Sequence, residues 1–244
     1  MVLKNDSRHF QPCPVRPKTQ ATPSERSMSH ITLIRHGQAN TEARDEVSYD
    51  RLSDLGHRQA AWLGEHLRQT GSFHPRLYCG TLLRHAETVE AMGMATDVTV
   101  DARLNELEYF TLAGLLETQH GVAVPQDREG FITHLPRVFG AWQRGEISDP
   151  PETFANFETR VDDALREIAC GEGPALVVTS GGLIAMAMRQ VLGLNTGAMA
   201  RMALAIMNTS MHRLFPIGGH WSPVLFNAVP HLDMPARREA QTHI

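Results

Sequence analysis

The sequence predicts an α/β fold in the form of a three-layer α/β/α sandwich, with a mostly parallel sheet and a lid inserted over the carboxyl ends of its strands. Two observations lead to this prediction. Short apolar and β-branched runs, each about one strand long, stand at residues 31–34, 76–79, 98–100 and 175–178. Helically spaced apolar residues separate these runs, and strands that are apolar throughout are typical of a parallel sheet covered on both faces.

The first predicted helix lies between the first two strands. Ser53 can cap its amino end and Gly71 can end it. One face of this helix is formed by Leu55, Gln59, Trp62, Leu63, His66 and Leu67. A later helix precedes the fourth strand and ends at Gly171, and its apolar face is formed by Phe154, Phe157, Val161, Ala164, Leu165 and Ile168.

Residues 104–151 interrupt this alternation of strand and helix, and we expect them to form the lid. They include a helically spaced apolar set, namely Phe131, Leu135, Val138, Phe139 and Trp142. Pro136 falls inside this set. Because proline lacks the N–H that a helix interior needs, we predict that the set does not form one unbroken helix.

Both ends of the chain are predicted to lie outside the domain, which spans residues 29–232. Residues 1–28 are polar, contain several prolines and hold almost nothing apolar, so we expect a disordered N-terminal tail. These prolines also argue against the amphipathic helix of a transit peptide, and Met28 is a candidate start of the protein. Residues 233–244 are mostly polar and predict a C-terminal tail.

Composition limits the class of protein. The 244 residues, 42% of them apolar, suit one core with excursions from it. A net charge of −4 argues against a surface that tracks nucleic acid, and no apolar run reaches the roughly 18 residues of a membrane span. The three cysteines, Cys13, Cys79 and Cys170, lie far apart and any disulfide would leave one over, so we expect a reducing cytoplasm.

Candidate functional residues follow three of the predicted strands. Ligands of open α/β sheets bind outside the carboxyl ends of the strands, so these positions are where a site is expected. After the first strand come Arg35, His36 and Gly37: a fixed cation, an imidazole, and a glycine that would let the backbone approach a ligand.

The second and fourth strands each lead into a helix. The helix after the second strand carries Arg84 in its first turns, and the helix after the fourth begins at Ser180, Gly181 and Gly182. Helix amino ends present unpaired N–H groups and a partial positive charge, which favour anions. Any of these features alone is also typical of ordinary packing or surface residues. Two arginines, two helix starts and one imidazole at adjacent strand ends indicate a phosphoryl-binding site.

Four motifs in order resemble those of the histidine phosphatase superfamily, also called phosphoglycerate mutase-like. They are LIRHGQ at residues 33–38, LSDLGHRQA at 52–60, CGTLLRHAET at 79–88 and LNE at 104–106. The resemblance extends over about residues 29–230. It implies a phosphatase domain whose partners are small-molecule or protein phosphomonoesters and inorganic phosphate.

The resemblance also implies roles for individual residues. His36 falls at the position of the nucleophile, Arg35 and Arg84 at positions that hold the phosphoryl oxygens, and Glu106 at that of the proton donor, with Glu108 as a nearby competitor. A neutral imidazole can attack phosphorus and form a phosphohistidine, and guanidinium groups stabilise the charge on the transferring group. This chemistry requires no metal and no cofactor.

The sequence departs from the family at its second histidine, which usually follows the late strand in a His-Gly pair. Here Ser180 stands in that place, as in a branch with Ser-Gly-Gly. The Ser180 hydroxyl and the Gly181 N–H can still donate hydrogen bonds, so we expect both to contact substrate, together with Gly37 and Gln38. A weakly active or inactive phosphate-binding module is the main alternative.

Two further alternatives are less favoured. Mutases of the family carry an asparagine six residues after the nucleophile and paired arginines in the lid; here Glu42 takes the first place and the lid has no Arg-Arg. A serine hydrolase could use Ser180 as its nucleophile, although Val178 replaces the glycine of that motif. Its base would be one of His212, His220 and His231. We interpret the remaining histidines beside the motifs, His57 and His85, as helix-face residues.

Overall fold

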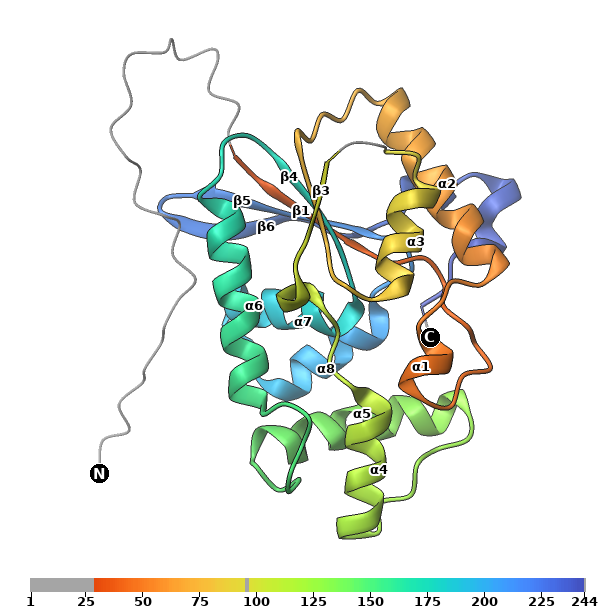
Figure 1. Ribbon diagram of the computed structural model, residues 1–244, viewed down its shortest axis with the longest axis vertical. Coiled ribbons are helices and arrows are strands. Elements are labelled where there is room, and N and C mark those ends of the chain that lie inside the picture. The colour runs from red at the N-terminus through yellow and green to blue at the C-terminus, as the bar shows by residue number, and fades with distance from the viewer. Residues whose placement is uncertain (1–28, 95–96, 244) are drawn as a thin grey trace.

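The computed structural model describes residues 29–94 and 97–243, and the tail predicted at residues 1–28 lies outside them. A six-stranded sheet in the order β3-β2-β4-β1-β5-β6 forms the centre of the molecule (Figure 1). Four neighbouring strands are parallel and match the predicted runs: β1 (Ile31–Arg35), β2 (Arg76–Cys79), β3 (Val98–Val100) and β4 (Ala175–Thr179). The predicted α/β class with a mostly parallel sheet is confirmed.

An antiparallel hairpin that the sequence analysis did not predict completes the sheet. It consists of β5 (Met211–Ile217) and β6 (His220–Ala228). Gly218 and Gly219 form its turn, with φ values of 59° and 83°, and a Gly-Gly pair between apolar runs was the available signal. Pro216 obscured that signal. The ladder between β5 and β1 ends at Leu214, so the missing N–H of Pro216 removes no hydrogen bond to β1.

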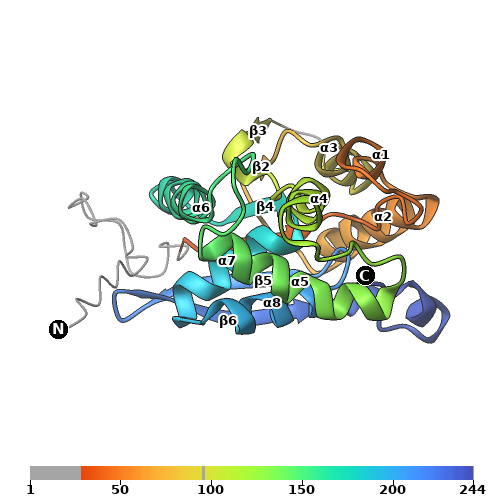
Figure 2. The same ribbon diagram turned by 90° about the horizontal axis from the view of Figure 1, so that it is seen from below.

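Helices cover both faces of the sheet, as the predicted three-layer sandwich requires (Figures 1 and 2). Successive residues of β4 point to opposite faces, and both are completely buried: Val177 packs on one side and Val178 on the other. The Val178 side is covered by α2 (Asp54–Gln69) and α3 (Leu83–Ala91). The Val177 side is covered by α6 (Phe154–Ala169), α7 (Gly181–Leu192) and α8 (Thr196–Ala205).

The two helices predicted by periodicity form where expected. Ser53 caps α2, its hydroxyl accepting a hydrogen bond from the N–H of Gly56, and Gly71 follows the helix with a φ of 61°. Every predicted apolar position of α6 is buried. In α2 the predicted face is wider than the part that meets the sheet, because Leu55 and Trp62 pack instead against the C-terminal segment.

The lid region contains α4 (Tyr109–His120) and α5 (Arg128–Gln143), which lie below the sheet in Figure 1. The prediction that Pro136 breaks the second of these helices is wrong, because α5 runs through it. Proline removes one N–H, but Leu135, Val138 and Phe139 are buried against the core and hold the helix in place. The N–H of Phe110 donates to Glu46 Oε1 at 2.8 Å, which joins α4 to α1 (Glu46–Tyr49).

The C-terminal residues differ from the expected polar tail at 233–244. After the short 3₁₀ helix η2 (Pro230–Leu232), the chain forms a second one, η3 (Pro235–Ala240), and Ala240 is buried. Gln59 Nε2 donates to the carbonyl of Ala240 at 2.6 Å, and Arg35 Nη1 donates to that of His243 at 2.6 Å. The segment is ordered because it covers the apolar outer face of α2 and satisfies buried donors.

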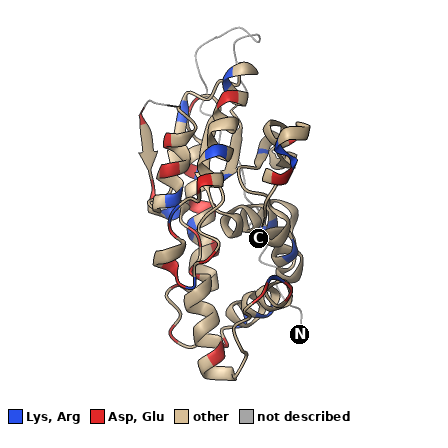
Figure 3. Cartoon of the chain, turned by 90° about the vertical axis from the view of Figure 1, so that its right-hand side faces the viewer, with Lys and Arg blue, Asp and Glu red and all other residues tan. Residues whose placement is uncertain are grey.

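Two observations bear on partners of the whole molecule. Lys and Arg are interspersed with Asp and Glu in Figure 3, and no blue patch dominates that view. Among the helices of the described ranges, none has the length and hydropathy to cross a membrane.

The contact between α2 and α3 generates a stability prediction. A Cβ on Gly64 would overlap the main-chain carbonyl of Met92, so Gly64→Ala must push the two helices apart. We expect a loss of about 1–3 kcal/mol in the free energy of unfolding, measured by urea denaturation. The matched control is Gly114→Ala on α4, where nothing lies within 4 Å of the new Cβ; it should be neutral or stabilise by up to about 1 kcal/mol. Equal effects of the two substitutions would contradict this packing.

Candidate active site

His36 directly follows β1, and the main chain places it beside the carboxyl end of β4 and the amino end of the antiparallel strand β5. Its N–H donates to the carbonyl of Thr179 at the end of β4 (2.8 Å), and its carbonyl accepts from the N–H of Thr209, just before β5 (3.3 Å). The residue is only 2% exposed. The position is the one expected of a ligand-binding residue in an open parallel sheet.

The hydrogen bonds of His36 fix the tautomer of its ring. Nδ1 lies 2.7 Å from the carbonyl oxygen of Gly37, and because a carbonyl only accepts, Nδ1 carries the proton. Nε2 therefore keeps a lone pair. Burial holds the pKa of His36 well below its usual 6.5, and the charges of Arg84 and Arg35 lower this pKa further. The imidazole is thus neutral, and its nitrogen is available as a nucleophile.

Arg84 enters the site from the first turn of α3. Its Nη1 forms an ion pair with Asp50 Oδ1 at 3.0 Å, and its guanidinium lies over the ring of Tyr49, 5.0 Å from the centroid. The carboxylate of Asp50 also accepts from the N–H groups of Leu83 and Arg84, so it caps the helix that carries its partner. The sequence analysis missed Asp50, which no local motif distinguishes.

Arg35 approaches from the opposite side. Its Nη1 donates to the main-chain carbonyls of Ile206 and His243. Its Nε lies 3.6 Å from where a Cβ of Gly181 would stand, at the amino end of α7. Gly181 is the first residue of that helix, so its N–H has no acceptor within the helix.

Two buried donors of these arginines lack a partner. Arg35 Nε and Arg84 Nε make no hydrogen bond to any of the residues that the structure describes. Both guanidinium charges lower the pKa of the His36 imidazole. Buried donors are costly to leave unpaired, so the arrangement favours an anion bound next to Nε2 of His36.

Gly37 and Gln38, which we expected to contact substrate, support the His36 loop. The N–H of Gly37 donates to Thr88 Oγ1 at 3.1 Å, and a Cβ on Gly37 would overlap the carbonyl of Gly56. The absence of a side chain thus allows close contact with α2. The N–H of Gln38 donates to Gln59 Oε1 at 2.8 Å.

Glu106 lies at the amino end of α7, beside the residues after β4. Its Oε2 accepts from the N–H of Gly182 at 2.7 Å, and its Oε1 accepts from the N–H of Leu107 at 3.0 Å. Glu108 instead starts α4 and accepts from the hydroxyl of Thr111 at 3.0 Å. Of the two carboxylates, only Glu106 is anchored to the helix that Ser180 begins.

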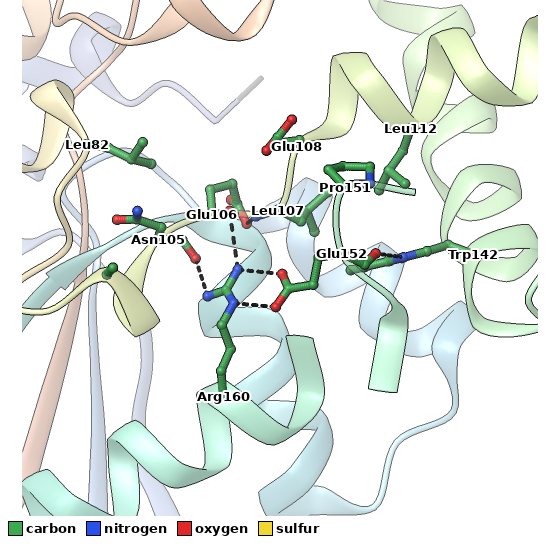
Figure 4. A pocket seen from close by; sticks show the side chains of 11 residues that line it. Leu82, Asn105, Glu106, Leu107, Glu108, Leu112, Trp142, Pro151, Glu152 and Arg160 are labelled. Atoms are coloured by element: carbon green, nitrogen blue, oxygen red, sulfur yellow. Dashed lines mark hydrogen bonds and ion pairs between the residues drawn. The ribbon is translucent and has the colours of Figure 1, made fainter. Parts of the chain in front are cut away.

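A cavity of about 220 Å³ is lined by Glu106, Glu152 and Arg160, among others (Figure 4). The Arg160 guanidinium forms a two-point ion pair with Glu152, at 2.7 and 2.9 Å, and donates to the carbonyls of Arg103 and Asn105. It therefore holds the segment that carries Glu106. Arg160 belongs to α6 and was missed, because a single arginine on an amphipathic helix is usually a surface residue.

The structure corrects the interpretation of His85 as a helix-face residue. His85 is completely buried, and its Nε2 lies 2.7 Å from Ser180 Oγ, which is also buried. The ring centroids of His85 and His36 are 5.8 Å apart. The exposure of His57 agrees with a helix-face position. α3 buries two consecutive residues, Arg84 and His85, and no sequence pattern indicated that His85 is one of them.

The bases proposed for a serine hydrolase do not serve Ser180. His212 Nε2 is bonded to Ser210 Oγ at 2.8 Å, and His231 Nε2 to Thr209 Oγ1 at 2.8 Å. His220 is an exposed residue at the β5–β6 turn. Ser180 therefore has none of these three histidines as a base. No cluster of three or more metal-ligating side chains occurs in residues 29–94 and 97–243.

Comparison with known proteins agrees with this geometry. Residues 31–229 match the family described as histidine phosphatase superfamily (branch 1). A probable phosphoglycerate mutase of Citrobacter koseri is 31% identical over 225 residues, covering 88% of this chain and all of that protein. A homologue of the same description from Salmonella arizonae is also 31% identical, over 227 residues, with the same coverage.

Solved structures share the fold at lower identity. A mutant phosphoserine phosphatase from Entamoeba histolytica, in complex with phosphoserine, has a TM-score of 0.60 at 16% identity and covers 84% of this chain and all of its own. A mycobacterial glucosyl-3-phosphoglycerate phosphatase complexed with VO3 has a TM-score of 0.59 at 24% identity, covering 82% and 99%.

The buried, neutral His36 generates a prediction for NMR. We expect the ring of His36 to keep its proton on Nδ1 and not to titrate between pH 8 and 5.5, because burial and two guanidinium charges oppose a second proton. In urea the same ring should titrate near 6.5. Below about pH 6.5 the unfolded chain therefore binds a proton at this histidine and the native chain does not. Proton binding then favours the unfolded state, so the free energy of unfolding falls as the pH drops below about 6.5. Native titration near 6.5 would contradict the description.

Proposed function

This chain belongs to the histidine phosphatase superfamily, and on that premise we propose that it is a metal-independent phosphomonoester hydrolase that acts through a phosphohistidine on His36. One observation carries the proposal: a buried, neutral imidazole with a free Nε2 is under the charge of two arginines, and the Nε donors of both have no partner among the residues described. A phosphoryl group is the ligand that suits both features, because it accepts hydrogen bonds from guanidinium groups and is attacked at phosphorus by imidazole.

In the first half-reaction, Nε2 of His36 attacks the phosphorus and the bond from phosphorus to the ester oxygen breaks. The ring becomes positively charged, and the Gly37 carbonyl stabilises this charge by accepting a hydrogen bond from Nδ1–H. Arg35 and Arg84 stabilise the negative charge on the equatorial oxygens. The leaving oxygen takes a proton from the protonated carboxyl group of Glu106.

In the second half-reaction, water attacks the phosphohistidine. Glu106, now a carboxylate, removes a proton from this water, and the bond from phosphorus to Nε2 breaks. Inorganic phosphate leaves, and His36 returns to its neutral state with the proton on Nδ1. The cycle restores every group, so it needs neither a metal nor another cofactor.

Hydrolysis is favoured over a mutase reaction, although the curated relatives are described as probable phosphoglycerate mutases. Glu42 stands six residues after His36, where a mutase of the family has asparagine, and its charge would repel the carboxylate of a phosphoglycerate. The lid lacks an Arg-Arg pair. The structural relatives described as phosphatases of phosphoserine and of a glucosylated phosphoglycerate suggest a small organic phosphomonoester as substrate.

The first test is hydrolysis of an aryl phosphate between pH 5 and 8 with EDTA present. We expect turnover by the native chain and none above background by His36→Ala. The matched control is His57→Ala, which removes an exposed histidine of α2 and should keep full turnover. Rapid quenching under alkaline conditions should place the phosphoryl group on His36. Tight phosphate binding without turnover in any of these proteins would favour the phosphate-binding module instead.

A second test concerns the fork of Arg84. Arg84→Lys keeps the charge but removes the Nε donor, so we expect kcat to fall about 10²- to 10³-fold, the usual cost of losing one donor to a developing anion. The control is Arg58→Lys, which makes the same substitution at an exposed arginine of α2 and should leave kcat unchanged. An unchanged kcat in Arg84→Lys would show that Arg84 contacts the substrate only as a charge or not at all.

A further inference from the structure

The contact between His85 and Ser180 joins two segments 95 residues apart in the sequence. His85 comes from the first turn of α3 and Ser180 from the junction of β4 and α7. Both are completely buried, and Nε2 of His85 lies 2.7 Å from Oγ of Ser180. His36 is near, with 5.8 Å between the two imidazole centroids. The pair therefore belongs to the wall of the site next to the nucleophile.

The surroundings of His85 decide which nitrogen carries the proton. Nδ1 makes no hydrogen bond within the described part of the chain, and the main chain of Gly80 lies against it, so that a Cβ there would overlap the nitrogen. A buried N–H without an acceptor is rarer in proteins than a buried acceptor without a donor. Burial, and next the charge of Arg84, hold the pKa of His85 well below its usual value, so the ring has one proton. That proton is on Nε2.

The consequence concerns the hydroxyl of Ser180. Because Nε2–H of His85 donates to Oγ, the hydrogen of Ser180 must point to another acceptor, and no second partner of Oγ occurs among the residues described. The N–H of Gly181 and Nε of Arg35 lie at the same helix end. Three donors thus lie at the amino end of α7, a position that favours an anionic oxygen as their acceptor.

We propose that Ser180 and His85 work as one unit in place of a second histidine: Ser180 is a catalytic residue whose hydroxyl donates to the transferring phosphoryl group, and His85 is the positioning residue that orients this hydroxyl. The inference rests on the proposed phosphatase function. Accepting a hydrogen bond from His85 also makes the hydroxyl a stronger donor, since linked hydrogen bonds polarise one another. No bond to Ser180 forms or breaks in the reaction.

A double-mutant cycle on aryl phosphate hydrolysis tests the unit. We expect Ser180→Ala to lower kcat about 10²-fold with a smaller change in KM, because the lost donor acts on charge that develops in the transition state. His85→Ala should lower kcat about 10-fold, since the hydroxyl remains but loses its orientation. The combination should be no worse than Ser180→Ala alone, because two residues that act as a unit are not additive.

Conservative and matched variants separate positioning from folding. His85→Gln can place an N–H near Nε2 and should recover most of the kcat that His85→Ala loses. The control is His231→Ala, which removes a buried histidine with the same kind of hydroxyl contact, to Thr209, and the same unpaired Nδ1. It should lower the unfolding midpoint while leaving kcat within about threefold of native.

If His85→Ala alone does not fold, a double variant that places the imidazole at position 180 instead of position 85 tests the same contact. Ser180→His introduces the family's usual residue, but the ring of His85 occupies the adjacent space. We therefore expect Ser180→His alone to lose activity and the pair Ser180→His with His85→Ala to recover at least 10-fold of it.

The outcomes distinguish this inference from the function on which it rests. If turnover is independent of His36, both are overturned. If turnover requires His36 but the effects of Ser180→Ala and His85→Ala multiply, or His85→Gln recovers nothing, only the paired role is overturned. Phosphoryl label found on Ser180 instead of His36 would also overturn it.

Discussion

The site depends on the burial of positive charge around a neutral imidazole. Arg35 and Arg84 each have one guanidinium nitrogen bonded to protein groups, and the Nε of each is buried with no partner in the described part of the chain. Buried unpaired donors are tolerated only where other contacts fix the side chain that carries them, or where a bound ligand accepts their hydrogen bonds. The ion pair with Asp50 and the carbonyl of His243 supply the first condition. A bound phosphoryl group would supply the second.

The parallel sheet brings these groups together. Adjacent β1 and β4 end at the same edge, so His36 and Ser180 meet although 144 residues separate them in the sequence. Close packing between main chains then fixes the loops: a Cβ on Gly37 would overlap the carbonyl of Gly56, and a Cβ on Gly56 would overlap that of Gln38. The ordered C-terminal segment belongs to the same support, since it covers α2 and accepts a hydrogen bond from Arg35.

The motifs predict a second histidine at position 180, where this chain has Ser180, and the imidazole in contact with Ser180 is that of His85. A histidine at position 180 would come from the end of β4, whereas His85 comes from α3 and reaches the same wall through the Ser180 hydroxyl. Periodicity could not show this. A histidine on a helix that begins near a motif has the same pattern whether it faces solvent or the interior, and only the packing of α3 against the sheet buries it.

Local periodicity, helix caps and motifs were enough to predict the four parallel strands, helices α2 and α6, and the family, because these features do not depend on contacts with distant segments. The sequence by itself also placed Arg35, His36 and Arg84 at strand ends. Tertiary structure alone decided the unbroken α5 through Pro136, the ordered C-terminal segment and the buried contact of His85. In each case the residues are buried by a segment that is distant in the sequence. Such contacts cannot be predicted from the local sequence pattern.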